Sequence, residues 1–240
     1  MDSVTADRKV ANRNVWILTI AQSLGGANSP IVISLGGLVG QRLATDPALI
    51  TLPVSLLNLG LALGTLPAAL VMRRFGRRSG YLLGALIGLT AGLVTALGIA
   101  RASFLVFCTG TCLAGFYSSY VQSYRFAAAD SETGAHSQRA IARVMIGGLV
   151  AAVIGPELVI WTRDALPGTP FAGSFLSQAA LAALSIPVLL TLRRAPAPPG
   201  YTADRAQDRP LAEILATPRY LLAIAAGIVS YGLMTFVMTA

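Results

Sequence analysis

Six long apolar stretches, free of charged side chains apart from Glu157, dominate this 240-residue sequence. The hydrocarbon core of a bilayer is about 30 Å thick, so a helix needs about 20 apolar residues to cross it. A charged side chain at the centre of such a helix costs about 2.5–3.5 kcal/mol on insertion scales, which explains their scarcity here. The predicted membrane spans are 14–41, 47–72, 79–100, 102–124, 144–162 and 165–192, and a seventh begins at Tyr220.

The composition excludes an ordinary soluble domain. Hydrophobic residues make up 55% of the chain and charged residues 12%, whereas about a quarter of a typical soluble domain is charged. The formal net charge of +8 raises the question of an anionic partner such as nucleic acid. We expect no nucleic-acid partner, because fifteen of the eighteen basic residues lie on one side of the predicted spans.

These basic residues predict the orientation of the chain in the membrane. The fifteen on one side are Arg8, Lys9, Arg13, Arg73, Arg74, Arg77, Arg78, Arg125, Arg139, Arg143, Arg193, Arg194, Arg205, Arg209 and Arg219. Arg42, Arg101 and Arg163 lie on the other side. The positive-inside rule places the arginine-rich side in the cytoplasm. The N-terminus lies on this side and is therefore expected to be cytoplasmic. The excess of arginine over lysine, seventeen to one, and the abundant alanine favour a bacterial source, so we expect a multi-pass protein of the bacterial cytoplasmic (inner) membrane.

The order of the segments indicates a bundle built in two halves. Residues 1–192 form the predicted six-helix part, 193–218 a proline-rich cytoplasmic linker and 219–240 a seventh transmembrane helix. Within the linker, Asp208 and Pro210 predict the start of a short amphipathic helix. The chain ends at Ala240 inside an apolar run, so we expect a fragment that lacks the C-terminal half of the same polypeptide.

The turn after the second span carries a recognisable motif. Arg74, Gly76, Arg77 and Arg78 resemble the signature loop of the major facilitator superfamily, Gly-x-x-x-Asp-Arg-x-Gly-Arg-Arg, at the same span number and membrane side. Two positions differ, since Ala69 replaces the first glycine and Arg73 replaces the aspartate. A plain alternative is a cluster of arginines that only marks the cytoplasmic side, with a glycine at a tight turn.

This resemblance implies a fold and an activity. The fold class is all-α integral membrane, a six-helix N-terminal bundle of two inverted three-helix repeats plus the start of helix seven. The implied function is secondary active transport of a small organic solute by alternating access around a midplane site, as proton-coupled symport or antiport. Two alternatives stay open: a half-size transporter that works as a homodimer, and a membrane assembly or structural subunit that transports nothing.

The fifth span resembles the antiporter signature of the same superfamily. Ala142, Ala151, Gly155 and Pro156 match its spacing, with alanines in place of two glycines, whereas Val159 and Ile160 replace its final glycine pair. Thr111 stands where the family has an arginine in the fourth span. Gly155 and Pro156 are therefore candidate gating residues, and ordinary packing of small residues against a neighbouring helix is the alternative.

Polar groups inside the apolar spans are the candidate substrate-binding residues. They are Gln22, Asn28, Ser29, Asn58, Tyr117 and Tyr120. An unpaired polar group is costly in hydrocarbon, so each needs either a wet cavity or a hydrogen bond to another helix. The run from Gly25 to Pro30 is also predicted to break the first span, as transporters do beside a substrate path. The tyrosines favour a planar organic solute over a sugar.

Glu157 is the acidic residue inside a predicted span and is the candidate coupling residue, with an outer interfacial position as the alternative. The segment 125–139, which contains Asp130, is predicted to be a solvated loop that pairs with Arg73 or Arg77. No arrangement typical of catalysis or metal binding occurs, and Cys108 and Cys112 lie within one span. We expect no enzyme activity, cofactor or metal; the expected partners are a small solute, protons and the lipid bilayer.

Overall fold

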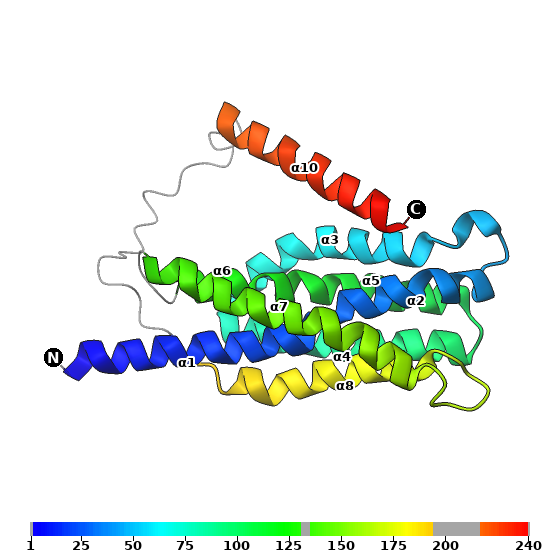
Figure 1. Ribbon diagram of the computed structural model, residues 1–240, viewed down its shortest axis with the longest axis horizontal. Helices are drawn as coiled ribbons and strands as arrows, with labels where there is room; N and C mark the ends of the chain where they lie inside the picture. Colours follow the sequence, from blue (N-terminus) through cyan, green and yellow to red (C-terminus); the bar gives the residue numbers. More distant parts are fainter. Residues whose placement is uncertain (1, 131–134, 194–216, 240) are drawn as a thin grey trace. The chain divides into compact units, whose positions relative to one another are not determined.

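The computed structural model describes residues 2–130, 135–193 and 217–239, and every regular element in these ranges is helical. The chain divides into two compact units, Met1–Pro198 and Pro199–Ala240. The helices of the first unit are α1 (Asp2–Gly25), α2 (Asn28–Leu43), α3 (Leu52–Phe75), α4 (Arg77–Ala100), α5 (Phe104–Gln122), α6 (Tyr124–Asp130), α7 (Ala135–Thr162) and α8 (Ala172–Leu190), with a short 3-10 turn η1 (Pro47–Leu49) (Figure 1). The second unit contributes α10 (Pro218–Thr239).

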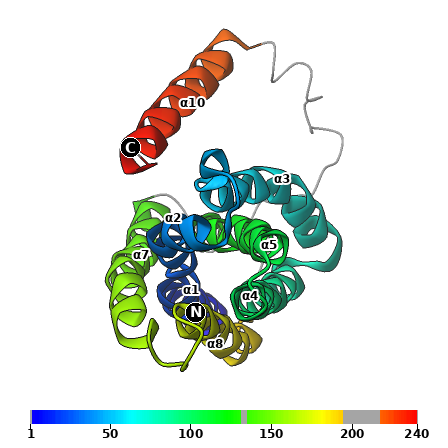
Figure 2. The same ribbon diagram turned by 90° about the vertical axis from the view of Figure 1, so that its right-hand side faces the viewer.

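The first unit is a helical bundle, and the segment that contains α5 is the most buried of its apolar helical segments. Helix α5 packs against α3 and α4, α4 packs against α8, and α1 packs against α7 and α8 (Figure 2). Glycines allow the closest of these approaches: Gly60 on α3 lies against the backbone of Cys112, and Gly115 on α5 lies against the backbone of Leu57. Small residues let transmembrane helices approach closely where lipid offers no competing hydrophobic force.

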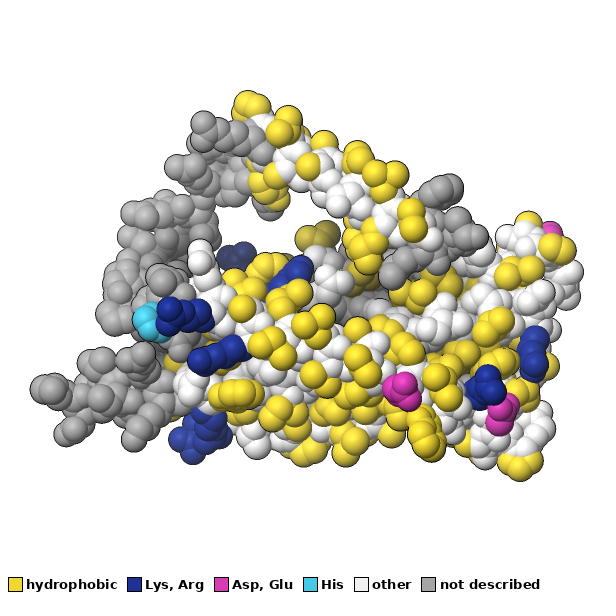
Figure 3. Space-filling view, in the orientation of Figure 1, with side chains coloured by type: hydrophobic (Ala, Val, Ile, Leu, Met, Phe, Trp, Pro, Cys, Tyr) yellow, Lys and Arg dark blue, Asp and Glu magenta, His cyan; other side chains and the backbone are white. Residues whose placement is uncertain are grey.

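Within the described residues, five helical segments are long and apolar enough to cross a membrane. They are Pro47–Phe75, Arg77–Ala100, Phe104–Asp130, His136–Thr162 and Ala172–Leu190. Hydrophobic side chains cover the middle of the visible face of the first unit, and Lys and Arg side chains gather toward its two ends (Figure 3). This distribution is that of a helical bundle surrounded by lipid.

The first predicted span is divided into α1 and α2, as the sequence predicts. Helix α1 ends at Gly25 and α2 begins at Asn28. Pro30 has no backbone N–H, so the carbonyl of Gly26 loses the donor that a continuous helix would give it. The break therefore follows directly from the proline and the glycines, and it lies within the bundle: Gly25 is buried against Tyr117, and Gly26 faces Ala151.

Two predicted boundaries are wrong. The segment 125–139 is helical over most of its described length, since α6 runs to Asp130 and α7 begins at Ala135, nine residues before the predicted fifth span. The predicted sixth span starts too early, because residues 165–171 form turns and Phe171 has a left-handed backbone (φ 72°) before α8 begins. The predicted amphipathic helix lies outside the described residues, and the apolar run from Tyr220 lies within α10.

Candidate functional site

A cluster of amide and hydroxyl groups lies where the first span breaks. The Asn28 amide nitrogen donates to the carbonyl of Ala114 at 2.9 Å and to the hydroxyl of Ser118 at 2.8 Å. The Gln178 amide nitrogen donates to Asn28 Oδ1 at 2.6 Å. Asn28 and Gln178 are each 2% exposed, and Ser118 is 5% exposed. The cluster thus joins α2, α5 and α8 through polar contacts inside the bundle.

Ser29 extends this cluster toward a less buried position. Its hydroxyl lies 3.1 Å from the Ser118 hydroxyl, and Ser29 itself is half-buried. The structure therefore brings together two predicted site residues, Asn28 and Ser29. It adds Ser118 and Gln178, which the sequence reasoning missed. A buried glutamine in an otherwise apolar span was the available signal for Gln178, because such a group requires a partner.

Tyr117 and Tyr120 are buried between α5 and α4, although both were predicted to contact substrate. Tyr117 is 1% exposed and its ring lies on Gly88, while Tyr120 is 3% exposed and lies on Gly84. The absence of a side chain on each glycine makes room for an aromatic ring. In this conformation both rings fill helix interfaces, and the Tyr117 hydroxyl reaches Gly25 at the end of α1.

Gln22 and Asn58 occupy half-buried positions apart from the cluster. Gln22 lies on α1 beside α7, close to Gly147 and Gly148. The Asn58 amide nitrogen donates to the Val54 carbonyl of its own helix at 3.3 Å. Both side chains are thus more accessible than Asn28 or the tyrosines.

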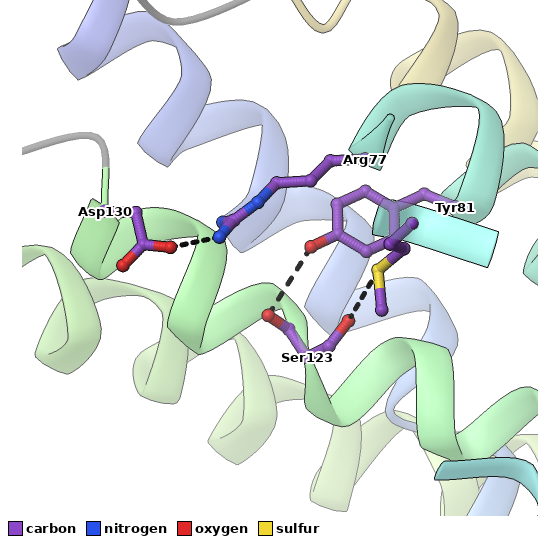
Figure 4. Close-up of polar contacts among 5 residues, drawn as sticks. Arg77, Tyr81, Ser123 and Asp130 are labelled. Atoms are coloured by element: carbon purple, nitrogen blue, oxygen red, sulfur yellow. Dashed lines mark hydrogen bonds and ion pairs between the residues drawn. The ribbon is translucent and has the colours of Figure 1, made fainter. Parts of the chain in front are cut away.

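The α3–α4 turn carries the predicted motif and contacts α6. Gly76 has a positive φ of 85°, a conformation that glycine adopts without steric cost. Arg77 forms an ion pair with Asp130, so one of the two predicted pairings is present (Figure 4). Arg74 and Arg78 are exposed, and the Arg74 guanidinium lies 5.5 Å from the centre of the Phe75 ring.

Tyr81 and Ser123 support this contact from within the bundle. The Tyr81 hydroxyl donates to the Ser123 carbonyl at 3.5 Å, and the Ser123 hydroxyl donates to the sulfur of Met72 at 3.6 Å (Figure 4). The Tyr81 ring also packs edge-on against Tyr124, with centroids 4.7 Å apart. These contacts fix the end of α3 and the start of α4 against the α5–α6 junction.

Helix α7 presents its candidate residues on different faces. Gly155 is buried against Pro30 and the carbonyl of Ala27, which are at the break in the first span. Pro156 and Glu157 are exposed, and Trp161 Nε1 donates to Glu157 Oε2 at 3.2 Å. Gly155 therefore lets α7 approach the break closely, whereas Glu157 points away from the buried cluster.

The described residues contain no group of histidine, cysteine, aspartate and glutamate side chains able to hold a metal ion. Cys108 is buried and Cys112 is half-buried on α5. The polar groups that remain, amides and hydroxyls in the apolar bundle, are suited to binding and orienting a neutral polar solute.

Residues 15–240 match the sequence profile of the Major Facilitator Superfamily. The chain belongs to this superfamily. The predicted superfamily is confirmed, together with the all-helical membrane fold. Among curated relatives, the chain is 64% identical to "Riboflavin transporter RfnT" of Brucella anthropi, over 98% of this chain and 59% of that protein. It is 28% identical to "Uncharacterized MFS-type transporter YdeG" of Bacillus subtilis, over 88% of this chain and 50% of that protein. No solved structure matches.

The chain therefore spans between half and three fifths of the length of these superfamily relatives. Both relatives carry the name of a transporter and neither that of an enzyme.

Proposed function

We propose that this chain is the N-terminal part of a transporter that moves riboflavin, or a closely related flavin, across the membrane by alternating access. The observation that carries the proposal is the 64% identity, over 98% of the chain, to a protein named as a riboflavin transporter. The similarity covers nearly the whole chain, and therefore the part of it that contains the candidate site.

The candidate residues suit such a solute. Riboflavin combines a planar ring, whose edge both donates and accepts hydrogen bonds, with a chain of hydroxyl groups. Gln22, Ser29 and Asn58 are half-buried polar side chains that can exchange hydrogen bonds with those groups. Asn28, Tyr117 and Tyr120 are at most 3% exposed, so any contact between them and the solute requires movement of the helices.

Proton coupling completes the proposal. Glu157 is an acidic residue within the apolar part of α7, and a carboxylate is a common proton carrier in membrane transporters. The missing partner is a C-terminal half of the same polypeptide, which would cover the polar surface of this bundle. A lone half would leave that surface in lipid, where unpaired polar groups are costly.

The test is transport by purified protein in liposomes. The full-length polypeptide, loaded into vesicles with and without a pH gradient, should move radiolabelled riboflavin with saturable kinetics, and excess unlabelled flavin should compete. Residues 1–240 alone should show no flux. Saturable flux of another solute with no riboflavin competition would overturn the substrate. Flux by residues 1–240 alone would favour the homodimer, and no flux of any solute would favour a structural subunit.

A further inference from the structure

The orientation of the Asn28 amide is determined by its partners. The Ala114 carbonyl can only accept a hydrogen bond, so the nitrogen of Asn28, and not its oxygen, must face α5. Asn28 Oδ1 then faces α8 and must accept, so Gln178 must present its own nitrogen. Gln178 Oε1 is consequently left buried, without a hydrogen-bond partner among the described residues.

A buried amide oxygen without a partner is costly, so its presence needs a reason. The groups around it supply one. The same glutamine holds Asn28, which is the first residue of α2, and Asn28 in turn donates to the Ser118 hydroxyl that contacts Ser29. Four side chains are therefore linked in series by hydrogen bonds: Gln178 of α8, Asn28 at the start of α2, Ser118 of α5 and Ser29 of α2.

We infer that Asn28 and Gln178 are positioning residues: together they fix the outer half of the first span, α2, against α5 and α8, and so hold the half-buried Ser29 in place to contact substrate. The inference rests on the proposed function, because Ser29 is a substrate contact only in a transporter. Asn28 makes three of the polar side-chain contacts at the start of α2, where the helix is interrupted between Gly25 and Asn28, and the Ser29–Ser118 contact adds a fourth.

The pair differs in one respect from an ordinary structural hydrogen bond. Replacing both partners by apolar side chains of similar shape removes the unpaired Gln178 oxygen together with the bond, so the fold loses little. The position of Ser29 is lost all the same, because apolar contacts do not fix the direction of α2. Stability and substrate affinity should therefore separate in a double variant.

The experiment compares Asn28→Leu, Gln178→Met and the double variant in the full-length protein, with Ser177→Ala as the control. Ser177 precedes Gln178, and its hydroxyl donates to the Ser174 carbonyl of its own helix at 2.7 Å. We expect the KM for riboflavin to rise about tenfold in both single variants and equally in the double variant. The maximal rate per folded molecule should change less than about twofold, and Ser177→Ala should match the parent.

Thermal unfolding supplies the second readout. The double variant should unfold closer to the parent than Asn28→Leu does, while its KM stays high. Recovery of the parental KM in the double variant would overturn the inference and give the pair a purely structural role. A KM change in Asn28→Leu alone would also overturn it, because Asn28 would then contact substrate directly.

Hydrogen exchange separates failure of this inference from failure of the proposed function. If the protein moves no flavin, exchange of the backbone amides of residues 25–31 still reports whether the pair holds α2. Faster exchange in all three variants than in the parent and Ser177→Ala would support the positioning role. Unchanged exchange would overturn it, whatever the substrate.

Discussion

Helices α5 and α7 both cross the membrane, but they relate to the bundle in opposite ways. In an apolar stretch of 18 residues within Phe104–Asp130, 61% of the residues are buried. In the corresponding stretch of His136–Thr162, only 22% of the residues are buried. Helix α5 carries glycine, serine and alanine where it meets its neighbours, whereas α7 turns large apolar side chains outward, with Leu149 70% and Val153 65% exposed. Two apolar helices of the same bundle therefore differ in how much of their surface is covered by other helices.

The difference shows how the site is held. Helix α5 supplies the Ala114 carbonyl and the Ser118 hydroxyl to the polar cluster, and its contacts with α3 and α4 leave these groups little freedom. Helix α7 contacts the break in the first predicted span through Gly155, whereas the large apolar side chains on its outward face are exposed. An outward apolar face of this kind belongs in lipid or against another protein segment. We therefore expect substitutions in α5 to act on the fold and those on the outer face of α7 to act on function.

The largest effect is expected at Gly115 of α5. A side chain there would meet the Leu57 carbonyl and the backbone of Leu61, neither of which can move without separating α3 from α5. Gly115→Val should therefore abolish most folded protein, measured as monodisperse protein in detergent. Gly148→Ala on α7 is the matched control, since its nearest neighbour would be the flexible end of Gln22 at 3.7 Å. Equal folding of both variants would contradict the contrast between α5 and α7.

A smaller effect on stability is expected at Phe107, near the start of α5. Its side chain is 0% exposed and packs edge-on against Phe175 of α8, with ring centroids 5.5 Å apart. Phe107→Ala should destabilise the protein by about 3–5 kcal/mol, the usual cost of removing a buried ring. The control is Trp161→Ala on α7, whose side chain is 79% exposed. Thermal unfolding should show a marked loss in the first variant and little in the second.

The sequence predicted the parts of this fold that local chemistry determines. Apolar length located the spans, and Pro30 with its preceding glycines located the break. Arginines at 125, 139 and 143 misled the prediction, because polar residues also continue a helix beyond the membrane, as α6 and α7 do. Spacing could not locate Gln178 in the cluster, because its partner Asn28 is 150 positions away. Burial of Tyr117 and Tyr120 likewise depends on glycines of a different helix.

The smallest effect on stability is expected at Glu157, where the effect on function should be largest. Its carboxylate is exposed on α7 and accepts a hydrogen bond from Trp161, which a glutamine oxygen can also accept. Glu157→Gln should therefore change the free energy of unfolding by no more than about 0.5 kcal/mol, as at other exposed sites. We expect riboflavin flux in liposomes to lose its dependence on the pH gradient, because an amide cannot carry a proton.

Trp161→Phe separates the two roles open to this carboxylate. The substitution removes the indole donor but keeps an aromatic ring and leaves the carboxylate free to take up protons. If Glu157 couples transport to protons, Trp161→Phe retains a pH-dependent flux that Glu157→Gln lacks. If the carboxylate only anchors the outer end of α7 through the indole, both variants keep their response to the gradient, and only Trp161→Phe loses the anchoring hydrogen bond. The face of α7 that carries Glu157 would then act in membrane positioning, and the coupling group would have to lie on another helix.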